Sequence, residues 1–372
     1  MTSPLQDPVP LAEVHRVLVT KLRHHGDVLL TSPVFSTLKR AAPHAEIDAL
    51  VYRETAPMLA NHPAIAQLHT IDRGGKTRGW IAQLREERAL LGALKARRYD
   101  LLLHLTEHPR GLTLSRLLRP RYAVTRERAA RGDKAWLWRR SFTHFYKLPR
   151  ATPRHTVETN LDALRRIGIY PEPSDKALVL VPGAAADAAA DALLDQHRLS
   201  RRGFLVAHPG SRWLFKCWPA ASTAALFDRL AAEGHRLVVT GAPDARERAL
   251  VDATLAAVRA ETRASIIDLT GTLTLPELAA VVARARAFVG VDSAPMHIAA
   301  AMGTPTVALF GPSGDIEWGP WRVPARVVTS TEHPCRPCGQ DGCGGGKVSE
   351  CLTTLPVDRV HAALAALLAE TR

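Results

Sequence analysis

Three loops in the second half of the chain combine small residues with charged ones, each directly after a predicted strand. The first is His208-Pro209-Gly210-Ser211, and Lys216 follows it. Gly210 and Ser211 leave backbone N–H groups accessible, while Lys216 offers a mobile positive charge suited to a phosphate. An ordinary turn with a surface lysine has the same sequence, so this loop alone leaves both interpretations open.

The second loop carries carboxylates. Asp244 follows Gly241, and Glu247 lies one turn into the predicted helix. An acidic residue in such a position accepts hydrogen bonds from ribose hydroxyls in dinucleotide-binding folds. Asp244 would equally serve as a helix N-cap without any ligand. The sequence leaves both roles open.

The third loop is the most informative, because Asp292 and Ser293 stand where a helix should begin. The first backbone N–H groups of a helix, with the positive end of its dipole, can receive a diphosphate. His297 would face the same cleft one turn later. The alternatives are an N-cap for Asp292 and a buried helical histidine for His297. The three loops taken together favour a phosphate site.

In the first half, Asp27 follows a predicted strand and Gly26. A carboxylate at the mouth of a cleft can take a proton from an acceptor hydroxyl as general base. A lone aspartate after a glycine is more often a helix cap, and this position by itself does not decide between the two.

Four of the five cysteines are crowded together near the C-terminus: Cys335, Cys338, Cys343 and Cys351. No secretory signal is apparent in the first thirty residues, so we expect a cytoplasmic protein with reduced thiols. Clustered thiols in that compartment indicate a structural zinc or iron site more often than disulfides. A reduced loop without metal is the alternative.

A scaffold of alternating strands and helices must position these loops. Buried strands are predicted at residues 16–20, 45–51, 64–71, 99–105, 204–207, 236–240, 266–269, 287–291 and 306–310, the last completing the second sheet. Amphipathic helices are predicted between them, at residues 33–41, 80–97, 220–233, 245–259, 275–286 and 357–370. This alternation is typical of α/β proteins with parallel sheets, and a Pro- and Ala-rich stretch near residues 170–200 separates two Rossmann-like halves. Ligands bind outside the carboxyl ends of such strands, here in a cleft between the halves.

Composition narrows the class of protein. The 372 residues carry a formal net charge of +13, which suggests an anionic partner. No apolar run is long enough to span a membrane. The sequence lacks G-x-G-x-x-G, Walker A and H-E-x-x-H motifs, so nicotinamide, P-loop and zincin chemistry lose their usual support. It also has no D-x-D carboxylate pair for a divalent cation.

The loops belong to a longer series of motifs that resembles the family 9 glycosyltransferases, the ADP-heptose:lipopolysaccharide heptosyltransferases. In chain order the motifs are Gly-Asp-Val-Leu-Leu-Thr-Ser-Pro at 26–33, His-Thr-Val-Glu-Thr-Asn-Leu at 155–161, His-Pro-Gly-Ser at 208–211, Lys-Cys-Trp-Pro at 216–219, Asp-Leu-Thr-Gly-Thr at 268–272, Gly-Val-Asp-Ser-Ala-Pro-Met-His at 290–297 and Gly-Thr-Pro-Thr-Val-Ala-Leu-Phe-Gly-Pro at 303–312. The Cys-rich end, with residues 347–352, is most similar to the heptosyltransferase III branch.

The resemblance implies a GT-B fold: an acceptor-binding domain at residues 1–175, a nucleotide-sugar domain at 176–355, and a C-terminal helix at 356–372 that packs back towards the first domain. It implies an inverting transfer of heptose from ADP-heptose to the lipopolysaccharide inner core that requires no metal cofactor. Asp27 would be the base and Lys216 would neutralise the leaving diphosphate.

Further roles follow from the resemblance. The donor would contact His208, Gly210, Ser211, Gly241, Asp244, Thr270, Gly271, Asp292, Ser293, Ala294 and His297. For the acceptor we expect Arg23, Arg110 and Arg116. The family often has a glutamate near Asp244, where this chain has Ala245, so Asp244 or Glu247 would have to replace it at the ribose.

The stretch 126–150 mixes many arginines with Trp136, Trp138, Phe142, Phe145 and Tyr146. It suits an anionic lipid A-core acceptor at the cytoplasmic face of the inner membrane, with aromatic rings at the interface. A solvated segment covering the acceptor cleft is the alternative. Two other functions are weaker: a related transferase with a protein or other surface-glycan acceptor, and a nucleic-acid-binding module, for which no recognition motif is present.

Overall fold

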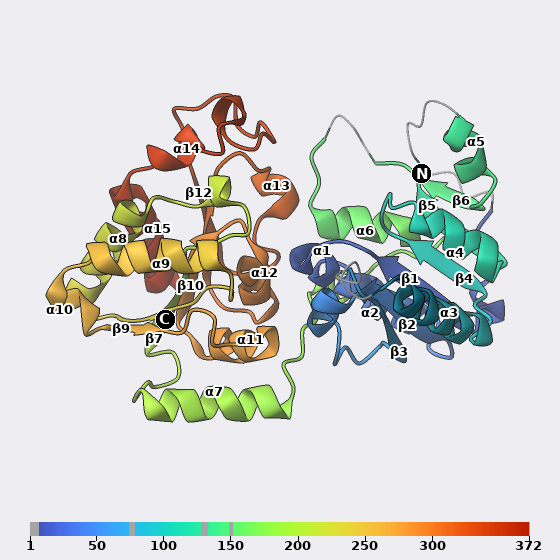
Figure 1. Cartoon of the computed structure of the whole chain (residues 1–372), viewed down its shortest axis with the longest axis horizontal. Helices are drawn as coiled ribbons and strands as arrows, with labels where there is room; N and C mark the ends of the chain where they lie inside the picture. Colours follow the sequence, from blue (N-terminus) through green and yellow to red (C-terminus); the bar gives the residue numbers. More distant parts are fainter. Residues whose placement is uncertain (1–6, 74–78, 128–132, 149–151, 372) are drawn as a thin grey trace. The chain divides into compact units, whose positions relative to one another are not determined.

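The computed structural model describes residues 7–73, 79–127, 133–148 and 152–371, which form two compact units, Met1–Val181 and Pro182–Arg372 (Figure 1). Each unit has a six-stranded, fully parallel sheet flanked by helices. The predicted α/β architecture of two Rossmann-like halves is therefore confirmed. The sequence put the boundary between residues 175 and 176, and the structure divides the units a few residues later.

The first unit has the strand order β3-β2-β1-β4-β5-β6. Its strands are β1 (Arg16–Lys21), β2 (Glu46–Tyr52), β3 (Gln67–Ile71), β4 (Leu101–His104), β5 (Tyr122–Arg126) and β6 (His144–Tyr146). Its α-helices are α1 (His25–Leu29), α2 (Ser32–Ala41), α3 (Trp80–Ala96), α4 (Arg110–Leu118), α5 (Asp133–Arg139) and α6 (Thr156–Arg165), and short 3-10 turns lie at Leu11–Glu13, Arg53–Met58 and Ser174–Lys176.

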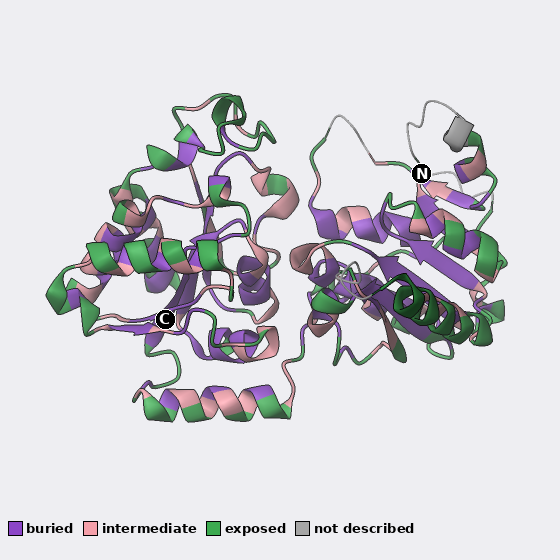
Figure 2. Cartoon of the chain, in the orientation of Figure 1, coloured by how far each residue is buried: buried purple, intermediate pink, exposed green. Residues whose placement is uncertain are grey.

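The central strands of this sheet are buried on both faces, as parallel strands covered by helices must be (Figure 2). Helix α2 packs with α6, and α3 contacts α4. The apolar core includes Leu18, Leu102 and Leu114. Among the described residues, no helix combines the length and the apolar character that crossing a membrane requires.

The aromatic stretch predicted to face a membrane is largely part of this core. Trp138 and Phe142 are buried in it, Tyr146 is buried in β6, and Phe145 packs against the core. Trp136 alone of the five is exposed, at 60%. Residues 128–132 and 149–150 of the stretch lie outside the described residues. The prediction of an aromatic membrane surface here was therefore wrong for Trp138, Phe142 and Tyr146, because their rings are buried inside the first unit.

The second unit has the strand order β12-β11-β10-β7-β8-β9. Its strands are β7 (Phe204–His208), β8 (Arg236–Val239), β9 (Ile266–Asp268), β10 (Ala287–Val291), β11 (Thr306–Phe310) and β12 (Ala325–Thr329). Its α-helices are α7 (Ala184–Gln196), α8 (Ala220–Ala232), α9 (Ala245–Ala257), α10 (Ala260–Arg263), α11 (Leu275–Arg284), α12 (Ala294–Ala301), α13 (Asp315–Trp318), α14 (Glu350–Thr353) and α15 (Val357–Glu370), and 3-10 turns lie at Leu214–Lys216 and Cys343–Gly345.

One detail of the second unit corrects the sequence prediction. Strand β12 continues the sheet beyond β11, which had been expected to complete it; only Val328 of its five residues is buried, so its apolar signal is weak. Helix α15 lies against α8, β11 and β12, because Val360, Leu364 and Leu367 belong to the core of the second unit.

Each sheet has one point where the chain reverses its direction of travel across the strands. In the first unit this switch lies between β1 and β4, and in the second between β7 and β10. The loops that leave neighbouring strands at a switch point diverge, which opens a crevice at the carboxyl ends. Asp27 follows β1, whereas the loop of Gly210 follows β7 and that of Asp292 follows β10.

Candidate active site

Lys216 and Asp292 meet at the switch point of the second unit. The Lys216 Nζ lies 2.6 Å from Asp292 Oδ2, so the 3-10 turn after β7 is joined to the end of β10. The Asp292 side chain is 7% exposed and that of Lys216 is 22% exposed. The pair therefore places a cation, partly open to solvent, beside the start of α12.

Helix α12 begins at Ala294 after the N-cap Ser293. The Ser293 hydroxyl makes no capping hydrogen bond and instead donates to the Val291 carbonyl at 3.3 Å. The first N–H groups of a helix have no partner within the helix, so this end can receive an anion beside Lys216. His297 is buried at 3%, with its ring 6.5 Å from the ring of Trp318. Its proposed contact with the sugar stays a prediction.

Two buried polar side chains, those of His208 and Glu247, support the loop that follows β7. His208 Nδ1 lies 2.9 Å from Thr240 Oγ1, and its Nε2 lies 3.6 Å from Glu247 Oε2. Burial alone would raise the pKa of Glu247, but the contact with His208 and the hydrogen bond from Ala242 N–H lower it overall. A Cβ at Gly210 would lie 2.6 Å from the Glu247 carboxylate, so only glycine fits this approach. The side chain of His208 thus supports the loop, and its predicted contact with the donor stays a prediction.

The other loops that are predicted to bind the donor, those of Gly241 and Gly271, also pack on one another. Gly271 N–H donates to the Gly241 carbonyl at 2.9 Å, and Gly271 has a φ of +74°, which favours glycine. A Cβ at Gly241 would lie 2.7 Å from the methyl group of the buried Thr270. These two glycines are thus required by the contact between the loops. The buried Ser211 accepts a hydrogen bond from Trp213 N–H at 3.4 Å.

Asp244 caps helix α9. Its Oδ1 accepts from Arg246 N–H at 3.0 Å, and the same carboxylate pairs with the Arg246 guanidinium. Glu247 is only 5% exposed and faces His208. The capping interpretation of Asp244 therefore describes the structure, and a ribose contact by either carboxylate stays a prediction.

Asp27 lies on the short helix α1, directly after the central strand of the first sheet. Its side chain is 12% exposed, and Arg23 Nε lies 3.6 Å from its Oδ1. The carboxylate is thus mostly shielded from water while one cation stands beside it. Arg23, expected to bind the acceptor, is 58% exposed at the same end of the sheet.

Sequence reasoning missed three buried polar residues, at the ends of β1 and β4 and on α6. The Lys21 ammonium donates to the Leu105 carbonyl at 3.2 Å and to Asn160 Oδ1 at 3.0 Å. Asn160 Nδ2 donates to the Leu30 carbonyl at 2.9 Å, which ties α6 to the end of α1. His104 Nδ1 lies 2.6 Å from Thr20 Oγ1, and burial lowers the pKa of His104 to about 3. The motif at 155–161 thus serves through Asn160 to hold the helix that carries Asp27.

The burial of Lys21 should be visible in the pH dependence of stability. Burial lowers its pKa from 10.5 to about 8, against the opposing attraction of Asp27. Between these values the unfolded chain holds a proton that the folded chain has lost, so stability rises with pH by up to about 3 kcal/mol. We expect the free energy of unfolding, measured by denaturant titration, to gain this increment from pH 8 to 10.5 in the wild type but not in Lys21→Met. Parallel pH profiles for the two proteins would contradict it.

Two further arginines were expected to bind the acceptor. Arg110 opens α4 at the carboxyl end of the sheet, but its guanidinium pairs with Glu87 of α3. Arg116 lies in the last turn of α4, about 9 Å along the helix from Arg110. A helix that crosses back over the sheet carries its last turn away from the carboxyl edge, and acceptor contacts by Arg110 and Arg116 stay predictions.

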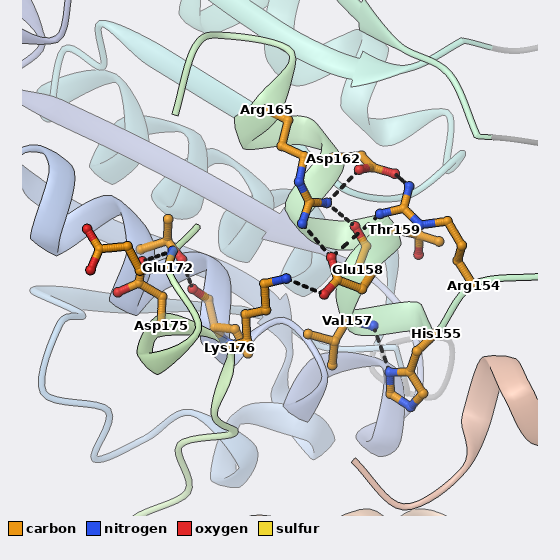
Figure 3. A network of polar contacts seen from close by, with 12 residues as sticks. Arg154, His155, Val157, Glu158, Thr159, Asp162, Arg165, Glu172, Asp175 and Lys176 are labelled. Carbon is orange, nitrogen blue, oxygen red and sulfur yellow. Dashed lines mark hydrogen bonds and ion pairs between the residues drawn. The ribbon is translucent and has the colours of Figure 1, made fainter. Parts of the chain in front are cut away.

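The other side of α6 carries a network of ion pairs (Figure 3). Glu158 contacts Arg154, Arg165 and Lys176, the last at 2.7 Å, and Asp162 pairs with both arginines. Lys176 belongs to the segment that follows α6. The network therefore fastens the chain that leaves the first unit onto α6, the helix that also supports α1.

The four clustered cysteines do not form a ligand set. Cys351 is buried, and its pKa is raised by burial, whereas Cys335, Cys338 and Cys343 are exposed. Within the described ranges, no three or more His, Cys, Asp or Glu side chains are grouped to hold a metal ion. The described side chains thus show no ready-made ligand set, and a structural zinc or iron ion stays a prediction that elemental analysis tests.

Comparison with known proteins adds to this geometry. The model of glycosyltransferase family 9 (heptosyltransferase) matches residues 87–348. Lipopolysaccharide heptosyltransferase 3 of Escherichia coli is 36% identical over 301 residues, which cover 81% of this chain and 84% of that protein.

Solved structures agree in fold. The family 9 glycosyl transferase from Veillonella parvula DSM 2008 has a TM-score of 0.80 at 24% identity, covering 96% of this chain and 97% of its own. The E. coli ADP-heptose lps heptosyltransferase II has a TM-score of 0.73 at 22% identity, covering 95% and 99%. The predicted GT-B fold is thereby confirmed.

Proposed function

This chain belongs to glycosyltransferase family 9, the heptosyltransferases, and from that membership we propose that it moves a heptose from ADP-heptose to the inner core of lipopolysaccharide. It is a glycosyltransferase enzyme. The E. coli relative that is 36% identical is named for the same type of transfer. The pairing of Lys216 with Asp292 at the head of α12 is the observation that carries the site.

The proposed reaction is a single displacement with inversion at the anomeric carbon. The acceptor hydroxyl oxygen forms a bond to that carbon as Asp27 takes its proton, and the bond from the carbon to the β-phosphate oxygen breaks. The electron pair of that bond leaves on ADP. Lys216 and the N–H groups at the head of α12 stabilise the charge that develops there, which is the role a divalent cation has in other transferases. We therefore propose that transfer needs no metal.

We further propose that the enzyme works at the cytoplasmic face of the inner membrane. Its acceptor, the lipid A-core, is anchored there, and the net charge of +13 suits an anionic surface. A peripheral association would bring the acceptor-binding unit to its substrate.

A donor and acceptor screen tests the proposed function. Purified enzyme is incubated with ADP- and UDP-sugars and with lipid A-core acceptors of defined length, with and without EDTA. We expect turnover with ADP-heptose and a heptose-containing core, and the same rate in EDTA. Turnover only with a protein acceptor, or only with a UDP-sugar, would contradict the proposal.

A further inference from the structure

The start of helix α3 exposes the most prominent apolar surface of the first unit. Trp80 is 74% exposed, Ile81 66% and Leu84 44%. Residues three and four apart share one face of a helix, so Leu84 lies beside both Trp80 and Ile81. Figure 2 shows α3 exposed along nearly its whole length, and Leu94 is its one fully buried residue among those described. The packing of this unit gives no reason for these three side chains to be apolar.

This surface lies at the end of the sheet where Asp27 lies. All six strands are parallel, so their carboxyl ends share one edge. A crossover helix begins at that edge, and Trp80 opens the helix that follows β3, as α1 with Asp27 follows β1. The apolar side chains therefore stand at the edge where the acceptor is expected to bind.

Positive charge accompanies the apolar residues. Arg85 and Arg88 are exposed one turn further along the same helix. Glu86 is exposed beside them and opposes one of these charges, whereas Glu87 pairs with Arg110, so the two arginines leave one positive charge in excess. A helix that begins with exposed apolar side chains, a tryptophan among them, and continues with arginines is typical of segments that dock at the interface of an anionic bilayer.

We propose that Trp80, Ile81 and Leu84 are a membrane-docking surface that enters the headgroup region of the anionic bilayer holding the acceptor lipid; the assignment of that bilayer rests on the proposed function. A stable protein interface needs about 800 Å² on each partner, far more than three side chains at one helix end offer. Shallow insertion into a bilayer needs no such area. Docking by this surface brings the edge with Asp27 to lipid-anchored core sugars.

Vesicle binding tests the proposal. Full-length enzyme is sedimented with vesicles of phosphatidylethanolamine and phosphatidylglycerol, comparing wild type with the triple variant Trp80→Ser, Ile81→Ser, Leu84→Ser. We expect the variant to bind at least about tenfold more weakly. The matched control is Val327→Ser with Val348→Ser, which changes apolar residues of the second unit that are 41% and 55% exposed. This control should bind like the wild type.

Turnover separates docking from folding and from the proposed function. The triple variant should transfer heptose to lipid-anchored acceptor in vesicles about tenfold more slowly, and to the same core oligosaccharide freed of its lipid at the wild-type rate. Unchanged vesicle binding by the triple variant would overturn the proposal. If no donor and acceptor pair reacts with the wild type, the proposed function fails, while vesicle binding still decides on the docking surface.

Discussion

Replacing Asp27 by asparagine should slow heptose transfer by about 10²–10⁴-fold, the usual contribution of a general base. Asparagine has the same shape but cannot take up the proton of the acceptor hydroxyl. The fold should be unaffected, because α1 is held by other groups, including the hydrogen bond from Asn160 to the Leu30 carbonyl. The Asp27 carboxylate has Arg23 at 3.6 Å as its ion partner, a pair that is long and half exposed.

Single-turnover rates and ADP binding check this prediction together. Asp27 belongs to the first unit and the proposed nucleotide site to the second, so ADP affinity should equal that of the wild type. Arg23→Gln is the matched control, since it removes the same ion pair but leaves the carboxylate. Because Arg23 is also predicted to contact the acceptor, this variant should raise the KM for the acceptor but keep most of the single-turnover rate at saturating acceptor. A transfer rate for Asp27→Asn within a few-fold of the wild type would exclude Asp27 as the base.

The elements that could be predicted from the sequence are those with strong periodic burial. Strands such as β10, with every residue buried, and loops such as Asp292-Ser293 follow directly from the apolar run and the residues that end it. The sequence therefore located the edge of each sheet that carries the site. Strand β12 was not predicted from the sequence, because four of its five residues are partly or fully exposed and its apolar pattern is weak.

The supporting residues of the site could not be predicted because their roles depend on contacts far apart in the chain. From the sequence, Lys21 is only the last residue of a strand, and the packing of α6 is needed to show that Asn160 accepts a hydrogen bond from it. Likewise, Glu247 could be a ribose ligand until the fold places it against Gly210 and His208. A local pattern can show which residue types are present, but it cannot show which of them meet.

The exposure of aromatic residues could not be predicted from the sequence either. Trp136, Trp138 and Phe142 look alike beside arginines, yet one is exposed and the others are core. Helix α3, which the sequence predicts as one of several amphipathic helices, carries an exposed tryptophan and an exposed leucine. Exposure of an aromatic ring depends on which neighbouring element covers it.

Replacing Lys216 by methionine should lower the rate of transfer by about 10²–10³-fold, as removal of one group that stabilises developing negative charge does in other active sites. When the bond to the β-phosphate breaks, negative charge grows on ADP, and the Lys216 ammonium beside the head of α12 is the cation placed to stabilise it. ADP itself should also bind more weakly. Rate and ADP affinity are measured by quenched flow and calorimetry.

The pairing of Lys216 with Asp292 offers a second explanation for such a loss, and a double-mutant cycle separates the two. If Lys216 served only to neutralise the buried Asp292, then Lys216→Met would cost nothing further once Asp292 is asparagine. If it stabilises the leaving diphosphate, the rate in the Asp292→Asn background should fall by a similar factor again. Thermal unfolding supplies the complementary readout, because an unpaired buried Asp292 destabilises the single variant Lys216→Met but not the double variant. A full recovery of rate in the double variant would remove Lys216 from the chemistry and leave it as a partner of Asp292.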